Sequence, residues 1–423
     1  MRYIFKFILC QIIGFDEVEF CTNLSVFEAS NLPKINYSHH RIANHIWIAP
    51  NPLLSETGLK DQDIKVFNYL DTKAFFATVK TASMPFDIFS AAFYLMSRYE
   101  EYLPSIRDKH DRFDAKQSLA YKENFLHQAV VDRWAIQLEK LILEKYSDLH
   151  LKKRNYSFVN TIDIDNAWAY KHKGIFRTWG AIAKDVSQLD WTNFIERIMV
   201  FLGKRRDMYD TYQFLFDLQN KYNYKSIYFF LFGDYGKYDR NVSSGNKEFR
   251  ALIKSIADEA EIGIHPSYSS NKNLHELEIE IKRLGKVIKR DIIKSRNHFL
   301  KLSFPTTYER LLEHDITDDY TMGYANAVGF RAGTSVSFPF YNIDLEQETK
   351  LLVHPFAVMD ATLLYYLKLT PEEGIALTKQ LIEEVKSVQG TFISLWHNET
   401  VTDTLQWKGW KMVYEKMIEA ANT

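Results

Sequence analysis

The stretch TIDIDNAW, residues 161–168, places two carboxylates one residue apart at the end of an otherwise apolar run. In a β-strand, residues i and i+2 point to the same face, so Asp163 and Asp165 would lie side by side. Neighbouring carboxylates repel each other unless a cation lies between them or one of them takes up a proton. The pattern therefore indicates either a divalent metal site or a structural role at a turn or helix cap.

Further polar side chains stand where other strands are predicted to end: His265, Arg296, His298, Arg331, His354, Asp360 and His397. In a parallel α/β barrel, functional groups gather at the carboxyl ends of the strands, so these side chains would share one face. A single strand histidine is more often a satisfied core residue than a ligand. Carboxylates and imidazoles together suit zinc or a similar divalent ion, and the set as a whole predicts a metal site.

The elements that would position these residues alternate between strand and helix from about residue 156 onward. Strand-like runs are predicted at 156–165, 226–233, 261–266, 296–302, 327–333, 351–359 and 391–397. Helices are predicted at 273–290 and 370–390, and Asn273 and Thr370 stand at their capping positions. This alternation predicts an α/β fold, and about seven strands favour a distorted parallel (β/α) barrel over an open sheet. No Gly-rich phosphate loop follows any of the strands, which argues against nucleotide binding.

Residues 1–150 are interpreted as a smaller α+β domain that precedes a barrel domain at 151–423. The apolar start, residues 1–20, is interrupted by Lys6 and Gln11 and lacks a cleavage site, so we interpret it as a buried strand and not as a signal peptide. Helices are predicted at about 86–102 and 125–147, with a charged loop at 107–114 between them. The apolar run 86–96 is far shorter than the roughly 20 residues that span a membrane.

The composition excludes some classes of function. A formal net charge of −1 on 423 residues provides no basic field for nucleic acid. Cys10 and Cys21 show no metal or disulfide spacing and fit buried thiols in a reducing compartment. We therefore expect a cytoplasmic protein without a transmembrane segment, and association with a membrane surface stays open. Aromatic residues, at 15%, would suit sugar stacking, although composition alone favours a large aromatic core.

The order of the motifs over about 156–400 resembles the polysaccharide deacetylase (NodB-homology) family, in its bacterial exopolysaccharide or capsule branch. In that family the motifs follow the order acidic strand end, His motif, Arg motif, Asp motif and a final Leu-x-His, which is here at 395–397. The N-terminal part, with SRYEEY and DKHDRF, looks like the extra domain that accompanies some of these enzymes. The resemblance implies a metal-dependent hydrolase, with Zn²⁺ as the expected ion, that removes acetyl groups from an amino sugar, a polysaccharide or a glycolipid precursor.

The same resemblance implies a metal site. Asp163 matches the catalytic base and Asp165 a metal ligand, although Ile164 separates two residues that are adjacent in the family, and their roles could be exchanged. His265 matches the first histidine of the His motif. The second falls on Ser269, a poor ligand, so His298 becomes the candidate for the third ligand, or is a structural residue.

The remaining roles are implied in the same way. Arg331 would orient the base, His397 would be the general acid, and Asp360 would tune it. In this scheme Asp163 takes a proton from the attacking water and protonated His397 hands one to the departing amine or alkoxide. A sugar subsite could be lined by Trp168, Tyr268 and Trp396, for which core packing is the alternative.

Two alternatives belong to other classes of function. The first is a catalytically inactive barrel that binds a carbohydrate and has lost its metal, for which Ser269 argues. The second is a metal-free amidohydrolase that acts on a small cyclic amide. Normal metal content would count against the first, and activity that survives chelation would favour the second.

Overall fold

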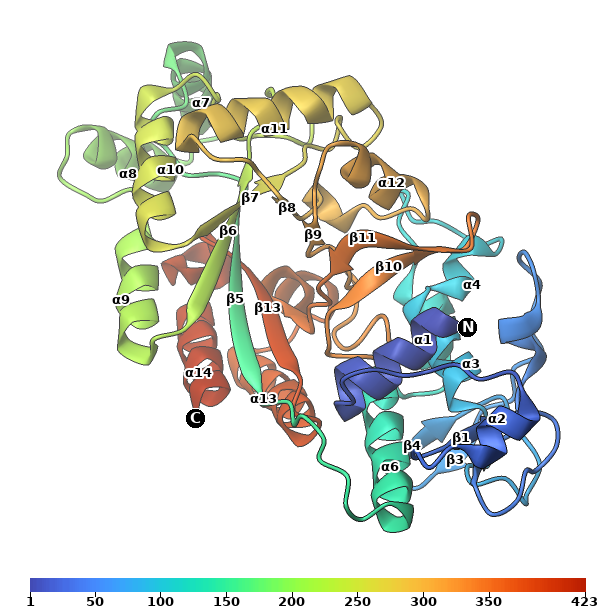
Figure 1. Ribbon diagram of the computed structural model, residues 1–423. Coiled ribbons are helices and arrows are strands. Elements are labelled where there is room, and N and C mark those ends of the chain that lie inside the picture. The colour runs from blue at the N-terminus through green and yellow to red at the C-terminus, as the bar shows by residue number, and fades with distance from the viewer.

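The central feature of the computed structural model, which describes residues 1–423, is a nine-stranded sheet (Figure 1). The strand order is β10-β11-β9-β8-β7-β6-β5-β13-β12. The strands are β5 (Ser157–Ile164), β6 (Lys225–Leu231), β7 (Glu261–His265), β8 (Lys294–Ser295), β9 (Asp318–Asp319), β10 (Phe338–Asn342), β11 (Gln347–Val353), β12 (Val358–Met359) and β13 (Thr391–His397). All neighbours pair in parallel except β10, which is antiparallel to β11. The predicted α/β class is confirmed, whereas strand pairing does not close the sheet into a barrel, because β10 and β12 do not pair.

Helices pack around this sheet (Figure 1). They are α7 (Ile175–Ser187), α8 (Trp191–Phe201), α9 (Tyr212–Tyr222), α10 (Lys247–Glu259), α11 (Leu274–Ile288), α12 (Thr306–Glu313), α13 (Pro371–Ser387) and α14 (Trp410–Asn422). The predicted helices at 273–290 and 370–390 are confirmed as α11 and α13. Their local signals explain this result: Asn273 accepts two backbone N–H bonds at the start of α11, and Thr370 and Glu373 form a reciprocal capping box.

Three predicted strands were wrong in whole or in part. The run 296–302 contains no strand, because the two residues that pair in β8, Lys294 and Ser295, precede it. Its residues His298–Leu300 form a 3₁₀ turn. The run 327–333 contains no strand, since Gly329 and Gly333 have positive φ and turn the chain. The run 351–359 holds the end of β11 and all of β12, with Pro355 in the break between them.

The N-terminal half is built from short elements. Its helices are α1 (Arg2–Lys6), α2 (Leu24–Ala29), α3 (Ile88–Met96), α4 (Tyr99–Tyr102), α5 (Leu119–Lys122) and α6 (Val130–Lys145). Its strands are β1 (Ile35–Tyr37) and β2 (Ile46–Ile48), which are parallel, and β3 (Phe67–Tyr69) and β4 (Thr72–Ala74), which are antiparallel. The predicted helix at 86–102 is divided into α3 and α4 by Arg98, whose φ is 55°, and the helix predicted at 125–147 is α6.

The chain start is buried as predicted, but it is helical and not a strand. A π-helical segment, Phe7–Ile13, continues α1 and contacts α6. Its apolar run is interrupted only by the exposed Gln11, and such a run does not distinguish a buried strand from a buried helix. Cys10 is half-buried and Cys21 is exposed, so the expectation of two buried thiols was wrong for Cys21.

The two halves of the chain share one hydrophobic cluster of 90 buried residues. Polar contacts also join them: Glu101 pairs with Arg331, and Asp132 accepts hydrogen bonds from Thr334 and Ser335. The domain division near residue 150 stays a prediction. None of the helices is both long enough and apolar enough to cross a bilayer.

Candidate metal and catalytic site

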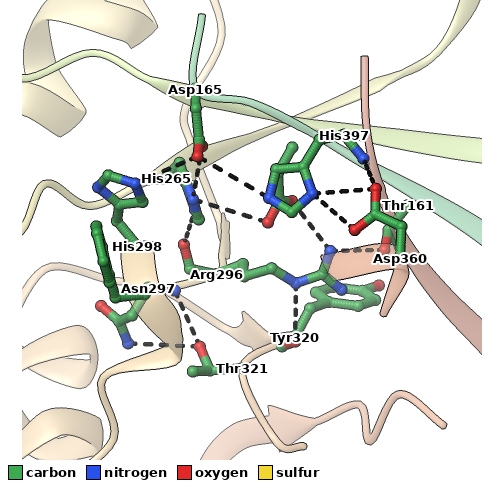
Figure 2. A network of polar contacts seen from close by, with 12 residues as sticks. Thr161, Asp165, His265, Arg296, Asn297, His298, Tyr320, Thr321, Asp360 and His397 are labelled. Carbon is green, nitrogen blue, oxygen red and sulfur yellow. Dashed lines mark hydrogen bonds and ion pairs between the residues drawn. The ribbon is translucent and has the colours of Figure 1, made fainter. Parts of the chain in front are cut away.

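Most of the polar residues predicted at strand ends meet at one edge of the sheet (Figure 2). His354 does not: it pairs with Asp318 and stacks on Tyr320. Asp163 pairs in register with His397 across β5 and β13, and Asp165 follows directly after β5. His265 ends β7, and His298 follows β8. Since β5, β7, β8 and β13 run in parallel, their carboxyl ends lie on the same side.

Asp165, His265 and His298 form a compact three-residue cluster. One ligand atom from each lies within 4.8 Å of the other two. Nε2 of His265 is 3.2 Å from Oδ1 of Asp165, and Nε2 of His298 is 3.3 Å from Oδ2 of the same carboxylate. The structure thus brings together the three predicted metal ligands, although β8 is far shorter than expected.

The far side of each imidazole in this cluster is held by an acceptor. Nδ1 of His265 contacts the carbonyl oxygen of Arg296, and Nδ1 of His298 lies 2.8 Å from Oδ1 of Asp239. Because these oxygens can only accept, each Nδ1 carries a proton, and Nε2 is the nitrogen of each ring that faces Asp165. Histidine ligands of metal ions are anchored in this way.

The cluster is organised to receive positive charge. Oδ1 of Asp165 is buried without a hydrogen-bond partner. Although burial opposes the charged forms, His298 and His265 hold the pKa of Asp165 well below its ordinary value, and Asp165 and Asp239 raise the pKa of His298 to about 9. A carboxylate whose two oxygens each face an imidazole nitrogen fits a divalent cation bound by nitrogen and oxygen donors.

Asp163 lies beside the cluster and is almost fully buried. Its Oδ1 accepts a hydrogen bond from Nη1 of Arg296 at 3.0 Å, and its Oδ2 is 3.7 Å from Nε2 of His265. Arg296 is itself fixed by Thr161 and by the carbonyl of Tyr320 (Figure 2). The carboxylate is thereby held in one orientation next to the three candidate ligands.

Arg331, the residue predicted to orient Asp163, lies elsewhere. Its guanidinium forms a two-point ion pair with the buried Glu101 and donates to the carbonyl of Gly323. Arg296 occupies the position expected for Arg331. The only signal in the sequence was that Arg296 stands two residues before His298, in the segment SRNH.

His397 and Asp360 form the pair that the sequence predicted. Nδ1 of His397 is 2.9 Å from Oδ1 of Asp360, and the backbone N–H of His397 donates to Oδ2. Burial alone would lower the pKa of His397, but Asp360 and then Asp165 raise it well above its ordinary value. Nε2 of His397 lies 3.9 Å from Oδ2 of Asp165, so a charged imidazole faces the cluster (Figure 2).

The three predicted sugar-lining aromatics separate in the structure. Trp396 is fully buried and donates to the sulfur of Met417, so its predicted position in a subsite was wrong. Adjacent strand residues point to opposite faces, which turns Trp396 away when His397 faces the site. Trp168 is also buried, against His172 and Phe249.

Tyr268 alone of the three remains part-exposed, and it belongs to an aromatic cluster. We call this cluster the rim, and it consists of His110, Tyr238, Tyr268 and Phe299. The ring of Phe299 packs edge to face against His298 with centroids 4.6 Å apart, so the rim adjoins the three-residue cluster. The rim therefore replaces the predicted subsite as the aromatic surface nearest the site.

One rim residue comes from the N-terminal half of the chain. His110 lies in the charged loop 107–114, which Arg112 fastens by donating to the carbonyl of Phe299 and to the hydroxyl of Tyr366. The sequence showed the charged loop but gave no sign of where it packs.

Comparisons with known proteins give one family match, near the start of the chain. A family described as "Family of unknown function (DUF7033)" matches residues 1–147. No curated protein matches the chain.

Several solved structures overlap with part of the chain. A probable polysaccharide deacetylase from Pseudomonas aeruginosa PAO1 is 11% identical, with 63% of this chain and 83% of that chain covered and a TM-score of 0.38. The PuuE allantoinase is 10% identical, with coverages of 63% and 83% and a TM-score of 0.38. BA3943, a CE4 family pseudoenzyme from Bacillus anthracis, is 12% identical, with coverages of 64% and 62% and a TM-score of 0.28.

Proposed function

We propose that this protein is a metal-dependent hydrolase that removes acetyl groups from an amino sugar carried on a polysaccharide or glycolipid precursor. The observation that carries the proposal is the convergence of three candidate ligands with a second carboxylate on one side and a charged imidazole on the other. Oδ2 of Asp163 lies 3.7 Å from Nε2 of His265, and Nε2 of His397 lies 3.9 Å from Asp165. A hydrolase of this class needs a ligand set, a base and an acid, and these residues would supply all three around one reacting group.

Asp165, His265 and His298 would hold the metal ion. Their one-oxygen, two-nitrogen donor set suits Zn²⁺, and the orphaned Oδ1 of Asp165 is an oxygen that a cation would satisfy. When bound, such an ion supplies Lewis acidity that activates water and polarises an acyl carbonyl.

Asp163 would act as the general base. Arg296 fixes one carboxylate oxygen, which leaves Oδ2 directed toward His265 and the three-residue cluster. A base must lie within hydrogen-bond reach of the proton that it removes, and Oδ2 is the atom of Asp163 that meets this condition. The proton would pass from the attacking water to Oδ2.

His397 would act as the general acid. Asp360 holds Nδ1, so the proton to be donated is the one on Nε2, which faces the cluster. The raised pKa keeps the imidazole protonated at neutral pH before the reaction. As the carbon–nitrogen or carbon–oxygen bond breaks, Nε2 would protonate the leaving amine or alkoxide.

The aromatic rim supports a sugar as the substrate. Tyr238 and Tyr268 lie with ring centroids 4.3 Å apart, and Lys301 stands 4.3 Å above the ring of Tyr268. Aromatic faces with a few polar groups around them are typical of sugar subsites. The acetyl group itself is inferred from the resemblance of the motifs and from the chemistry of the three roles.

Metal analysis together with acetate release tests the proposal. We expect about one divalent ion per chain in the purified protein, and loss of the ion in Asp165→Ala, His265→Ala and His298→Ala. His275→Ala, which alters an exposed histidine of α11, is the matched control. Asp163→Asn should retain the metal while releasing no acetate from a panel of acetylated amino sugars and oligosaccharides.

Three outcomes would contradict the proposal. Absence of metal after loading with Zn²⁺ would exclude the metal-dependent mechanism, and hydrolysis that survives chelation would favour the metal-free amidohydrolase. Sugar binding by a protein that holds no metal and releases no acetate would identify the catalytically inactive carbohydrate-binding barrel.

A further inference from the structure

The α7–α8 hairpin, residues 172–206, leaves a large apolar surface uncovered. Its exposed apolar side chains are Ile175, Phe176, Trp179, Val186, Leu189, Trp191, Ile195, Phe201 and Leu202. Phe176 is 94% exposed and Trp179 is 66% exposed. Isolated apolar residues at a protein surface are ordinary, but a contiguous set on two neighbouring helices marks an interaction site.

The inner side of the same hairpin buries an ion pair. The only buried residue of α7 is Asp185, and those of α8 are Arg197 and Val200. Asp185 and Arg197 form an ion pair at 2.9 Å, and Arg197 lies over the ring of Tyr170. A helix that faces water shows the opposite arrangement, with its apolar stripe turned toward the core. The hairpin is therefore built to present its apolar side to a non-aqueous partner.

The charge of the hairpin identifies the partner's chemistry. Residues 172–206 contain seven Lys and Arg against three Asp and Glu, in a chain whose formal net charge is −1. Arg197, Arg205 and Arg206 form ion pairs with Asp185, Glu196 and Asp210, respectively. Lys184 and Lys204 are exposed and have no ion-pair partner. Apolar residues that include tryptophan, mixed with lysine and arginine, are typical of helices that lie in the interface of an anionic bilayer.

A second copy of the chain fits this surface less well. A two-fold interface brings the same patch of both subunits together, so each basic segment would face its own copy. Like charges placed opposite each other oppose association, whereas anionic lipid headgroups attract the same residues.

The hairpin is rooted next to the candidate site. Asp207 accepts backbone N–H bonds from Ala169, Tyr170 and Lys171, which joins the two ends of the hairpin. Asn398, the neighbour of His397, donates to the carbonyl of Asn166, the neighbour of Asp165. A surface that binds the hairpin would therefore lie beside the sheet edge that carries the site.

We propose that the α7–α8 hairpin docks this protein on the surface of an anionic lipid bilayer. The apolar side chains would enter the interface between headgroups and acyl chains, and Lys184 and Lys204 would contact the headgroups. The proposal does not depend on the hydrolase activity proposed above.

Sedimentation with vesicles tests it on the full chain. Vesicles of phosphatidylcholine alone are compared with vesicles that also contain phosphatidylglycerol, at low and high salt. We expect the wild-type protein to sediment with the anionic vesicles and to be released by salt. The double variant Phe176→Ser/Trp179→Ser should weaken this binding at least tenfold, and Lys184→Glu/Lys204→Glu should abolish the preference for anionic lipid.

Leu32→Ser is the matched control. Leu32 is 62% exposed, similar to Trp179, and it follows α2, at the opposite end of the molecule from α7 and α8 (Figure 1). Its vesicle binding should equal that of the wild-type protein. Since all the altered side chains are exposed, circular dichroism should show unchanged folding, and quenching of Trp179 and Trp191 fluorescence by brominated lipid gives a second readout in the unaltered chain.

Three results would overturn the proposal. The first is no sedimentation of the wild-type protein with anionic vesicles, and the second is equal binding by the wild-type protein and the Phe176→Ser/Trp179→Ser variant. The third is a wild-type dimer in analytical ultracentrifugation that this variant converts to monomers, without vesicle binding by either, which would assign the surface to a second copy.

Discussion

Oδ1 of Asp239 lies 2.8 Å from Nδ1 of His298, on the side of the imidazole that faces away from Asp165. Asp239 is buried and also accepts the backbone N–H of Tyr268, so it joins the three-residue cluster to the rim. A carboxylate at this position fixes the orientation of the ring and makes Nε2 a stronger donor to a cation.

Asp239→Asn is therefore expected to weaken metal binding by about ten- to a hundredfold, the usual range for such outer partners, without removing a ligand. The amide oxygen can still accept the N–H of Tyr268, so the loop should stay in place. Competition with a coloured zinc chelator measures the affinity. Asp234→Asn, whose carboxylate is exposed, is the control, and equal affinities for both variants would contradict a role for Asp239 in metal binding.

The pH dependence of metal binding follows from the pKa of His298. Asp165 and Asp239 raise that pKa to about 9 against the opposing effect of burial, so the metal-free site holds a proton that a metal ion must displace. Affinity should fall by about tenfold for each pH unit below 9, because one proton competes. Titration with Zn²⁺ at several pH values between 6.5 and 9 measures this slope, and an affinity independent of pH would show that His298 is not a ligand.

Arg331→Gln should separate the structural arginine from the arginine of the site. The substitution breaks the two-point pair with buried Glu101, which Arg98 still contacts. Breaking a buried pair is strongly destabilising, and we expect the free energy of unfolding to fall by about 3 kcal/mol. Metal content should stay at the wild-type value. Urea denaturation and metal analysis on the same preparation measure both quantities. Loss of metal from a folded Arg331→Gln variant would show that Arg331 takes part in the metal site.

The parts of the fold that could be predicted are those with strong local signals. Caps at Asn273 and Thr370 located α11 and α13, and the apolar runs of β5, β6 and β13 located the middle of the sheet. Whether the sheet closes into a barrel could not be predicted, since the apolar pattern of a strand does not determine which strands pair at the edges. The segment 327–333 misled because residues buried in a turn are as apolar as those in a strand.

The site was predictable where function follows from position at a strand end, as for Asp165, His265 and His397. The contacts that His298 and Arg331 make with carboxylates from distant parts of the chain could not be predicted. Asp239 is 59 residues from His298, and Glu101 is 230 residues from Arg331. A motif position for Arg331 could not reveal which carboxylate its guanidinium would meet.

A buried carboxylate of α11 gives a prediction for stability. Burial raises the pKa of Glu280 to about 7, from an ordinary value of 4.5, although Ser267 partly opposes the shift. The folded chain therefore holds this proton more tightly than the unfolded chain does. The resulting stability is fully present below pH 4.5 and is lost as the pH rises through about 7.

Glu280→Gln should remove this dependence. The variant should match the wild-type protein near pH 4 and exceed its free energy of unfolding by about 3 kcal/mol near pH 8. Urea denaturation across this pH range provides the measurement, with Glu276→Gln, a part-exposed position on the same helix, as the control. Parallel stability curves for the wild-type protein and Glu280→Gln would contradict the raised pKa.

The charged loop 107–114 gives the last prediction, which concerns the N-terminal half. Arg112 donates to the carbonyl of Phe299 at 2.9 Å and to the hydroxyl of Tyr366 at 3.1 Å, and the same loop places His110 in the rim. Arg112→Ala should free the loop and disorder one wall of the proposed sugar subsite, while the three candidate ligands stay in place. We expect a KM for an acetylated oligosaccharide at least tenfold higher, with metal content unchanged.

Arg41→Ala, an exposed arginine in the same half of the chain, is the matched control and should leave KM unaltered. A fall in kcat at constant KM would mean that the loop acts on the reacting groups and not on sugar binding. Equal values for Arg112→Ala and the wild-type protein would show that the N-terminal half does not take part in the site. The comparison of KM with kcat thus distinguishes a wall of the subsite from a support of the catalytic groups, because only a wall that contacts bound sugar alters binding alone.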